Sequence, residues 1–234
     1  VRVQPKISIV TVVLNDSENF TKTASSISQI NYSNFEYIVI DGESTDGTKI
    51  AIESFRSIID INISEKDCGL YDAMNKGIEI ASGDWIVFMN AGDQFTSNDT
   101  LNLIFDNSNF EGFDILYGDA IVSYPKFKVN EPTGNIFDLN EGMQFCHQSA
   151  FINLDYHKKI KYNISNKFCA DFEFFYNAFV NKVSFFKIEY AVSNVLPNGI
   201  SGRNRERVFL SWWRVVGYND YKLNILYSLR IFSA

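Results

Sequence analysis

Carboxylate and amide side chains follow several short apolar runs in the first part of the chain. Gathered at one edge of a sheet, such oxygens can hold a divalent cation or bind the polar groups of a ligand. A cluster of carboxylates is costly without such a partner, because like charges repel. The alternative interpretation is that each of these residues belongs to a solvated turn. The residues are Asn15, Asp16, Asp41, Glu65, Asp67, Asn90 and Asp93.

The segment 41–48, DGESTDGT, combines glycine with short polar side chains. Gly42 and Gly47 permit unusual backbone angles. Ser44 and the two residues that follow it can cap the next helix. These features alone would make a structural turn. With Asp41 at its start, the segment also offers a carboxylate that can accept a hydrogen bond from the N–H of a nucleotide base.

Polar residues also gather at the start of a helix that we expect from Gly69 onward. A helix N-terminus favours anionic or sugar ligands, so we interpret this segment as a binding element in which Asp72 helps to orient the ligand. The alternative is a helix that buries Met74, with Tyr71, Asp72 and Asn75 as surface or capping residues.

The elements that must position these residues follow from the hydrophobic pattern. The β-branched run Ile7–Val13 is typical of a strand buried on both faces of a parallel sheet. Segments with helical spacing separate it from similar runs at 37–41, 59–64 and 85–89. This alternation predicts an α/β sheet with mostly parallel strands, in which ligands bind at the carboxyl ends of the strands. Beyond Asp93 we expect helices at 101–105 and 170–180. We also expect a strand or hairpin at 115–124, a strand at 145–152, and one or two strands at 183–195.

Composition narrows the class of protein. Hydrophobic residues make up 46% of the 234 residues and aromatic residues 15%, so disorder is disfavoured. The net charge of −7 argues against nucleic-acid binding through a basic surface. Three cysteines without metal-ligand spacing suggest reduced thiols in the cytoplasm. No apolar run approaches the roughly 18 residues of a membrane span. Without repeats or a long linker, we expect one domain over 1–234.

Five segments occur in a specific order across about residues 5–200: PKISIVTVVLN, VIDGESTDGT, EKDCGLYDAMNKGIEIASGDWIVFMNAGD, HQSAF and ADFEF. Together they resemble the family 2 glycosyltransferases of bacterial polysaccharide and O-antigen assembly. The resemblance implies a GT-A fold, an α/β nucleotide-binding sandwich with a C-terminal acceptor-binding part, and a transfer that inverts the anomeric carbon. It divides the domain into a nucleotide-sugar half (about 1–95), an acceptor and catalytic half (about 96–200) and a tail (201–234).

The resemblance also implies roles for single residues. Thr11 and Asp41 would contact the nucleoside, Asp67 the base or ribose, and Lys76 would lie near the nucleotide. Asp93 would bind the Mn²⁺ or Mg²⁺ that bridges the diphosphate of a UDP-sugar. The full set of expected donor-binding residues is Thr11, Asn15, Asp41, Gly42, Ser44, Asp67, Gly69, Asp72, Asn75, Lys76, Asn90, Ala91, Gly92 and Arg203.

The segment 90–93, NAGD, departs from many relatives, which carry two or three carboxylates there. Asp93 is its sole anionic ligand, so His147 is a second candidate ligand, with a structural hydrogen bond as the alternative. Asp171, in ADFEF, matches the acidic motif in which relatives carry the catalytic base. A helix cap is its alternative role. Glu173 is the alternative base, although on a helix it points about 200° away from Asp171.

The C-terminal tail is basic and aromatic, and Arg203 precedes it in a glycine-rich segment that could close over the diphosphate. Such a tail either packs on the core or lies on an anionic membrane. We therefore expect a cytoplasmic enzyme, with peripheral contact to the inner membrane as one alternative, acting on a saccharide or polyprenyl-pyrophosphate-linked acceptor. The rival functions are a sugar-1-phosphate nucleotidyltransferase and a non-catalytic sugar-nucleotide or glycan-binding domain.

Overall fold

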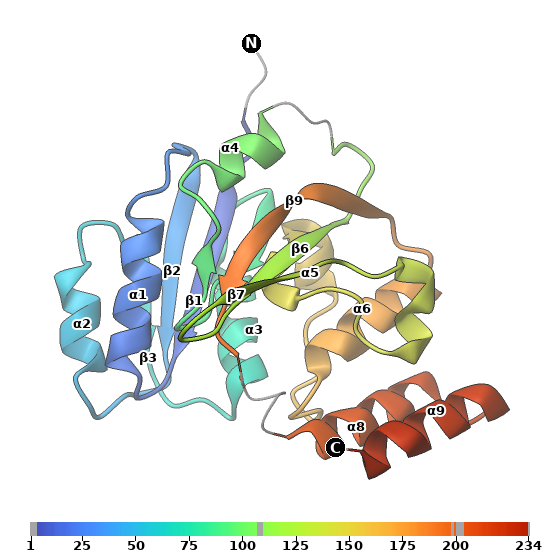
Figure 1. The fold of residues 1–234 in the computed structure, drawn as a ribbon. Helices are drawn as coiled ribbons and strands as arrows, with labels where there is room; N and C mark the ends of the chain where they lie inside the picture. Colours follow the sequence, from blue (N-terminus) through green and yellow to red (C-terminus); the bar gives the residue numbers. More distant parts are fainter. Residues whose placement is uncertain (1–3, 107–109, 198, 200–203, 234) are drawn as a thin grey trace.

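The computed structural model describes residues 4–106, 110–197, 199 and 204–233. Within these ranges nine strands form one sheet in the order β3-β2-β1-β4-β8-β6-β9-β5, with β7 paired to β6 (Figure 1). The strands are β1 (Ile7–Val13), β2 (Phe35–Asp41), β3 (Ile61–Ser64), β4 (Trp85–Phe88), β5 (Gln94–Phe95), β6 (Ile115–Ser123), β7 (Lys128–Glu131), β8 (Ala150–Asn153) and β9 (Phe185–Val195).

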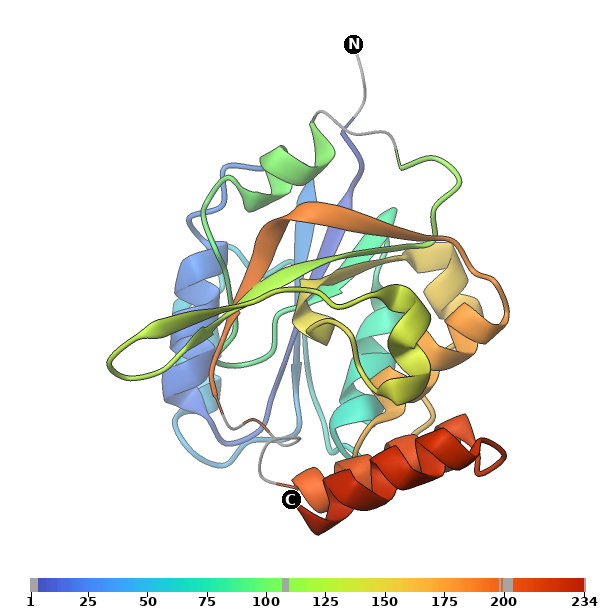
Figure 2. The same ribbon diagram turned by 45° about the vertical axis from the view of Figure 1, so that its right-hand side comes forward.

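Helices cover both faces of this sheet (Figures 1 and 2). The α-helices are α1 (Ser17–Ile27), α2 (Thr48–Ser54), α3 (Leu70–Ile80), α4 (Thr100–Phe105), α5 (Leu154–Lys159), α6 (Ala170–Val180), α8 (Arg205–Val216) and α9 (Tyr221–Phe232). Two 3₁₀ helices, η1 (Ile136–Glu141) and η2 (His147–Ser149), lie between β7 and β8 in the chain.

The N-terminal half has the parallel arrangement that the sequence predicts. β1 pairs in parallel with β2 and β4, and β2 pairs in parallel with β3. Every residue of β1 is buried, because its alternate side chains enter two different cores. Ile9 and Val13 pack with α1, whereas Val10 and Val12 pack with α3. The α/β GT-A fold class is confirmed, and the carboxyl ends of these strands lie at one edge.

The C-terminal half adds strands of mixed direction. β8 is antiparallel to both β4 and β6, and β6 is parallel to β9. The expectation of a continuous strand over 145–152 is wrong in its first part: His147–Ser149 forms η2, and the strand begins at Ala150. Because η2 is not a strand, its side chains do not alternate between the two faces of the sheet. Instead, His147 lies near Asp171, and Gln148 bonds to Asp93.

The tail forms two helices, α8 and α9, which lie side by side beneath α6 (Figures 1 and 2). Trp212 of α8 packs on Phe172 of α6, with ring centroids 5.1 Å apart. Tyr227 of α9 is buried and donates a hydrogen bond to the carbonyl of Asn140, 2.8 Å away. The tail therefore packs on the core through α8, as one of the two alternatives expected. One side of α9 stays exposed.

Candidate active site

Asp41 is fully buried at the end of β2, where it shapes the following turn. Its carboxylate accepts hydrogen bonds from the backbone N–H of Ser44 at 3.1 Å and from the hydroxyl of Ser64 at 2.5 Å. These donors satisfy a charge that burial would otherwise make costly. Asp41 thus joins the ends of β2 and β3 and fixes the turn between β2 and α2.

Asn15 joins the same turn to the end of β1. Its side-chain oxygen accepts a hydrogen bond from the N–H of Thr45 at 2.8 Å, while its own N–H donates to the Ser44 hydroxyl at 2.8 Å. Asn15 has a φ of 51°, a conformation that asparagine tolerates better than most residues. The structure therefore brings Asn15, Asp41 and Ser44 together as the sequence predicts.

Gly42 and Asp67 lie against each other beside this turn. A Cβ on Gly42 would lie 2.8 Å from Oδ2 of Asp67, so a larger residue at this position would displace that carboxylate. The other oxygen, Oδ1, forms an ion pair of 2.6 Å with Lys76, which also pairs with Glu65 at 2.9 Å. Although partial burial of Lys76 opposes it, bonding to Asp67 and Glu65 raises the lysine pKa to about 12. Lys76 is thus a fixed cation at the edge where β3 ends.

Some expected donor-binding side chains are already occupied by structural bonds. Thr11 is fully buried and donates to the carbonyl of Met89 at 2.7 Å. Asn75 uses both ends of its amide on the backbone of Tyr162, at 2.9 and 3.0 Å. Asp72 accepts a hydrogen bond from the N–H of Cys68 at 2.8 Å, and Gly69, with a φ of 129°, immediately precedes α3. Asp72 therefore ties the first turn of α3 to the backbone that precedes the helix.

The turn 90–93 follows β4 and buries the carboxylate of Asp93. Burial raises the pKa of Asp93 to about 7, although hydrogen bonds from Gln148 and Asn90 act in the opposite direction. Gly92, with a φ of 102°, lets the turn bond to Thr23 and to the backbone of Asn19. Ala91 continues the turn, with its N–H bonded to the carbonyl of Val12 at 3.3 Å.

Two features of this turn fit a divalent cation. No ion pair to Asp93 occurs in the part of the chain that the structure describes, so its buried carboxylate lacks the cation that would favour ionisation. The side-chain oxygen of Asn90 is buried and has no hydrogen-bond partner among the same residues. Within those described ranges, however, no group of three or more His, Cys, Asp or Glu side chains could hold a metal. The protein ligands are therefore few.

Asp171 lies in the first turn of α6, with 21% of its side chain exposed. Its Oδ1 accepts hydrogen bonds from the hydroxyl of Tyr71 at 2.8 Å and from the N–H of Phe172 at 2.9 Å. Its Oδ2 lies 4.0 Å from Nδ1 of His147. The N-terminus of α6 favours a negative charge at this position. One oxygen is thus held in place, and the other accepts no hydrogen bond from the residues described.

The short helix η2 connects Asp171 with Asp93. His147 faces Asp171, and its neighbour Gln148 donates a 2.9 Å hydrogen bond to Oδ2 of Asp93. Burial lowers the pKa of His147, so the ring is neutral near pH 7. Its Nε2 is buried without a partner among the described residues. Consecutive residues of η2 therefore bring the two carboxylates into one site.

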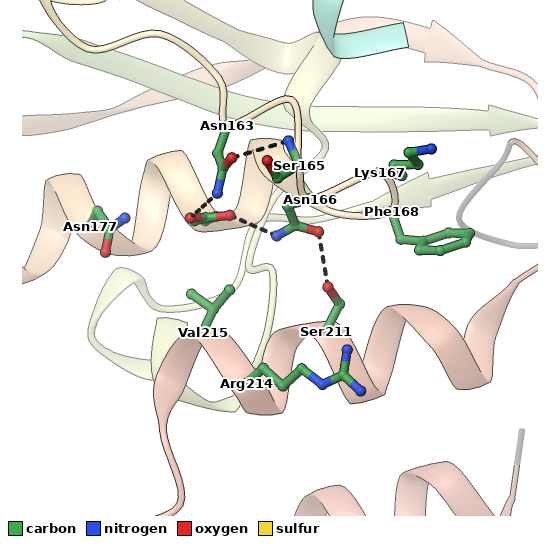
Figure 3. Close-up of a pocket in the computed structure, with 10 residues that line it drawn as sticks. Asn163, Ser165, Asn166, Lys167, Phe168, Asn177, Ser211, Arg214 and Val215 are labelled. Atoms are coloured by element: carbon green, nitrogen blue, oxygen red, sulfur yellow. Dashed lines mark hydrogen bonds between the residues drawn. The ribbon is translucent and has the colours of Figure 1, made fainter. Parts of the chain in front are cut away.

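Glu173, the alternative base, lies on another side of α6 and lines a pocket of about 600 Å³ (Figure 3). Its two oxygens accept hydrogen bonds from the amides of Asn163 and Asn166, at 2.9 and 2.7 Å. Ser211 of α8 donates to Asn166 in turn, at 2.9 Å. The carboxylate of Glu173 therefore joins α6 to a loop and to α8. Both oxygens of Glu173 are thus engaged, whereas at Asp171 only Oδ1 accepts hydrogen bonds from the described residues.

Sequence reasoning missed two residues of this site. Gln148 and Tyr71 lie within the segments HQSAF and GLYDAMNKG, which were recognised as motifs, but their partners are distant in the chain. Arg203, expected near the diphosphate, lies outside the described residues. Its neighbour Arg205 stands at the start of α8, 5.7 Å from the ring of Phe209.

The order and directions of the strands are those of a GT-A fold, and comparisons with solved structures agree. The chain is similar to solved structures of S. aureus TarS (TM-score 0.68, 17% identity, 97% of this chain and 72% of that one). It is also similar to a mannosyltransferase from Pyrobaculum calidifontis in complex with GDP-Man and Mn²⁺ (TM-score 0.68, 13% identity, 98% and 70%). At this identity the likeness concerns the fold.

Sequence comparison identifies the family. The family described as glycosyl transferase family 2 matches residues 8–185. A PGL/p-HBAD biosynthesis glycosyltransferase of Mycobacterium bovis is 31% identical over 189 residues, which is 76% of this chain and 71% of the relative. The chain belongs to glycosyltransferase family 2 and is a glycosyltransferase.

Proposed function

We propose that this enzyme transfers a sugar from a UDP-sugar to a hydroxyl group of a saccharide acceptor, with inversion of the anomeric carbon. The observation that carries the proposal is the pairing made by η2, in which His147 faces Asp171 and Gln148 holds Asp93. A base for the acceptor and a carboxylate for a diphosphate-bound cation thus belong to one site, which a group transfer between two substrates requires.

The donor end of the site lies where β1, β2 and β3 end. Asn15, Ser44 and Asp41 order the turn that we propose contacts the nucleoside, and the pair of Asp67 with Lys76 closes its edge. The TarS structures include complexes with UDP and with UDP-GlcNAc, which supports a uridine nucleotide as donor. Residues from about 1 to 95 would then form the donor half, and those from about 96 to 200 the acceptor half.

In the proposed reaction, the oxygen of the acceptor hydroxyl attacks the anomeric carbon, and Oδ2 of Asp171 accepts the proton of that hydroxyl. A new C–O bond forms as the bond between that carbon and the diphosphate oxygen breaks on the opposite face. Asp93, assisted by Asn90, would hold Mn²⁺ or Mg²⁺, whose positive charge stabilises the leaving diphosphate. The partial exposure of Asp171 leaves room for the acceptor.

We further propose a lipid-linked acceptor at the cytoplasmic face of the inner membrane. None of the described helices is long and apolar enough to cross a bilayer. On α9, however, four apolar side chains spaced along one side are exposed, and Phe232 is 91% exposed. This side suits a peripheral contact with lipid. The residues are Tyr221, Ile225, Leu229 and Phe232.

A donor screen tests the proposed function. Wild-type protein is incubated with UDP-GlcNAc, UDP-glucose, UDP-galactose and GDP-mannose, with and without Mn²⁺ and a synthetic polyprenyl-pyrophosphate saccharide. Release of UDP that depends on the acceptor supports the proposal, and NMR of the product gives the anomeric configuration. Asp171→Asn should abolish transfer while donor binding, measured by calorimetry, stays within about twofold. Transfer at the wild-type rate in this variant would remove Asp171 from the mechanism.

A further inference from the structure

Tyr71 and Asp171 form a direct contact between the two halves of the site. Tyr71 lies in the first turn of α3, and its hydroxyl donates a 2.8 Å hydrogen bond to Oδ1 of Asp171 across a separation of 100 residues. Gly69, with a φ of 129°, immediately precedes α3, and Tyr71 is the second residue of the helix. The contact thus depends on where α3 begins.

The hydroxyl of Tyr71 can act as a donor throughout the physiological pH range. Tyr71 is buried, and burial together with the nearby Asp171 raises its pKa well above the ordinary value. A tyrosine in this state keeps its proton, and a hydrogen bond to a charged acceptor is stronger than one between neutral groups. The bond therefore holds Oδ1 whenever Asp171 is ionised.

We propose that Tyr71 is a positioning residue for the catalytic base. Tyr71 and the N–H of Phe172 both bond to Oδ1, which holds the carboxylate in place and leaves Oδ2 free to take the acceptor proton. Tyr71 itself touches no reacting atom. The inference rests on the proposed function, because it assumes that Asp171 takes the acceptor proton.

Tyr162 provides a matched control. Its ring lies 5.5 Å from that of Tyr71, and it is similarly buried. Its hydroxyl, unlike that of Tyr71, has no hydrogen-bond partner among the described residues. Removing either hydroxyl deletes one oxygen from the same aromatic cluster, but the Tyr71 hydroxyl alone bonds to Asp171.

The experiment compares Tyr71→Phe with Tyr162→Phe, using the donor that the wild-type protein turns over fastest. We expect Tyr71→Phe to lower kcat roughly ten- to a hundredfold, the value of a hydrogen bond to a charged group. The Kd of UDP, from calorimetry, should stay within twofold. Tyr162→Phe should retain wild-type kcat and Kd. A merely structural role of Tyr71 would weaken UDP binding and kcat together.

A double-mutant cycle provides a readout that does not depend on turnover. The effects of Tyr71→Phe and Asp171→Ala on the free energy of unfolding in urea should be non-additive, because each substitution removes the hydrogen bond between these two side chains. Additive effects, or wild-type kcat in Tyr71→Phe, would overturn the inference. Loss of transfer in Asp171→Asn with full activity in Tyr71→Phe would leave the proposed function standing, whereas full activity in Asp171→Asn would refute the assignment of the base itself.

Discussion

The side-chain amide of Gln148 donates a 2.9 Å hydrogen bond to the buried carboxylate of Asp93. Cys146 donates to the oxygen of the same amide at 2.9 Å, which orients the NH₂ group toward Asp93. In metal sites, partners of this kind orient the ligand and are nearly as important as the ligand itself. If Asp93 holds the cation as proposed, Gln148 supports that ligand without touching either substrate.

Replacement of Gln148 by alanine should weaken Mn²⁺-dependent UDP binding roughly ten- to a hundredfold. The reason is that Asp93 would lose the donor that favours its ionised form and fixes its orientation. Calorimetry with UDP, with and without Mn²⁺, measures the effect. Gln144→Ala is the control, because the amide of Gln144 bonds to backbone carbonyls of residues 138 and 142. Equal losses in both variants would contradict the role of Gln148.

The stability of the metal-free protein should fall as the pH rises from about 4 to about 7, relative to Asp93→Asn. Burial raises the folded-state pKa of Asp93 from 3.8 to about 7, so the protonated carboxyl is the form that folding favours. The stabilising effect is complete below about pH 4 and is lost as the pH rises through about 7. Each pH unit in this window lowers the free energy of unfolding by at most about 1.4 kcal/mol.

Urea unfolding of both proteins at pH 4.5, 6 and 8 measures this difference. Saturating Mn²⁺ should reduce the decline in the wild-type protein, because the cation favours the ionised carboxylate. Parallel stability profiles for wild-type protein and Asp93→Asn would show that the carboxylate does not titrate in this range.

Replacement of Gly42 by alanine should weaken UDP binding by roughly tenfold, or about 1.4 kcal/mol. The added Cβ would approach Oδ2 of Asp67 to 2.8 Å and push that carboxylate away from Lys76. Gly47→Ala, in the same turn, is the control, since the nearest atom to its Cβ would be 3.6 Å away. Unchanged UDP affinity in Gly42→Ala would argue against a donor site at this edge.

The double substitution Leu229→Ser with Phe232→Ser should reduce binding to anionic phospholipid vesicles by about tenfold or more, because two apolar side chains would no longer enter the lipid. Co-sedimentation with vesicles measures it. Ile50→Ser is the control, because Ile50 is 77% exposed and belongs to α2, a helix on the opposite side of the molecule from α9 (Figure 1). Wild-type protein that stays entirely in the supernatant would refute the membrane contact.

The sequence was sufficient to predict those features that depend on local pattern. The buried run Ile7–Val13 and the helix over 170–180 appear with the expected bounds, and Asn15, Asp41 and Ser44 meet at the strand ends. What could not be predicted were contacts between residues distant in the chain. Gln148 and Asp93 are 55 residues apart, and no local signal indicates that an amide will bond to a given carboxylate.

The same limitation applies to expected donor-binding residues whose side chains are bonded to the protein backbone. In the sequence, Thr11 and Asn75 are polar residues near a predicted ligand edge. In the structure, the hydroxyl of Thr11 is bonded to a carbonyl of the neighbouring β4–turn segment, and the amide of Asn75 is bonded to the backbone of Tyr162. A polar side chain satisfied by the backbone resembles a ligand-binding one until its partner is known.

The paired hydrogen bonds between Asn75 and Tyr162 constrain how the enzyme can move. They attach α3, in the proposed donor half, to the segment that leads into α6, in the proposed acceptor half. A hinge between the halves would have to break both bonds and the Tyr71–Asp171 contact at once. We therefore expect substrates to enter and products to leave through rearrangement of surface loops. The two halves should stay in one fixed arrangement during the catalytic cycle.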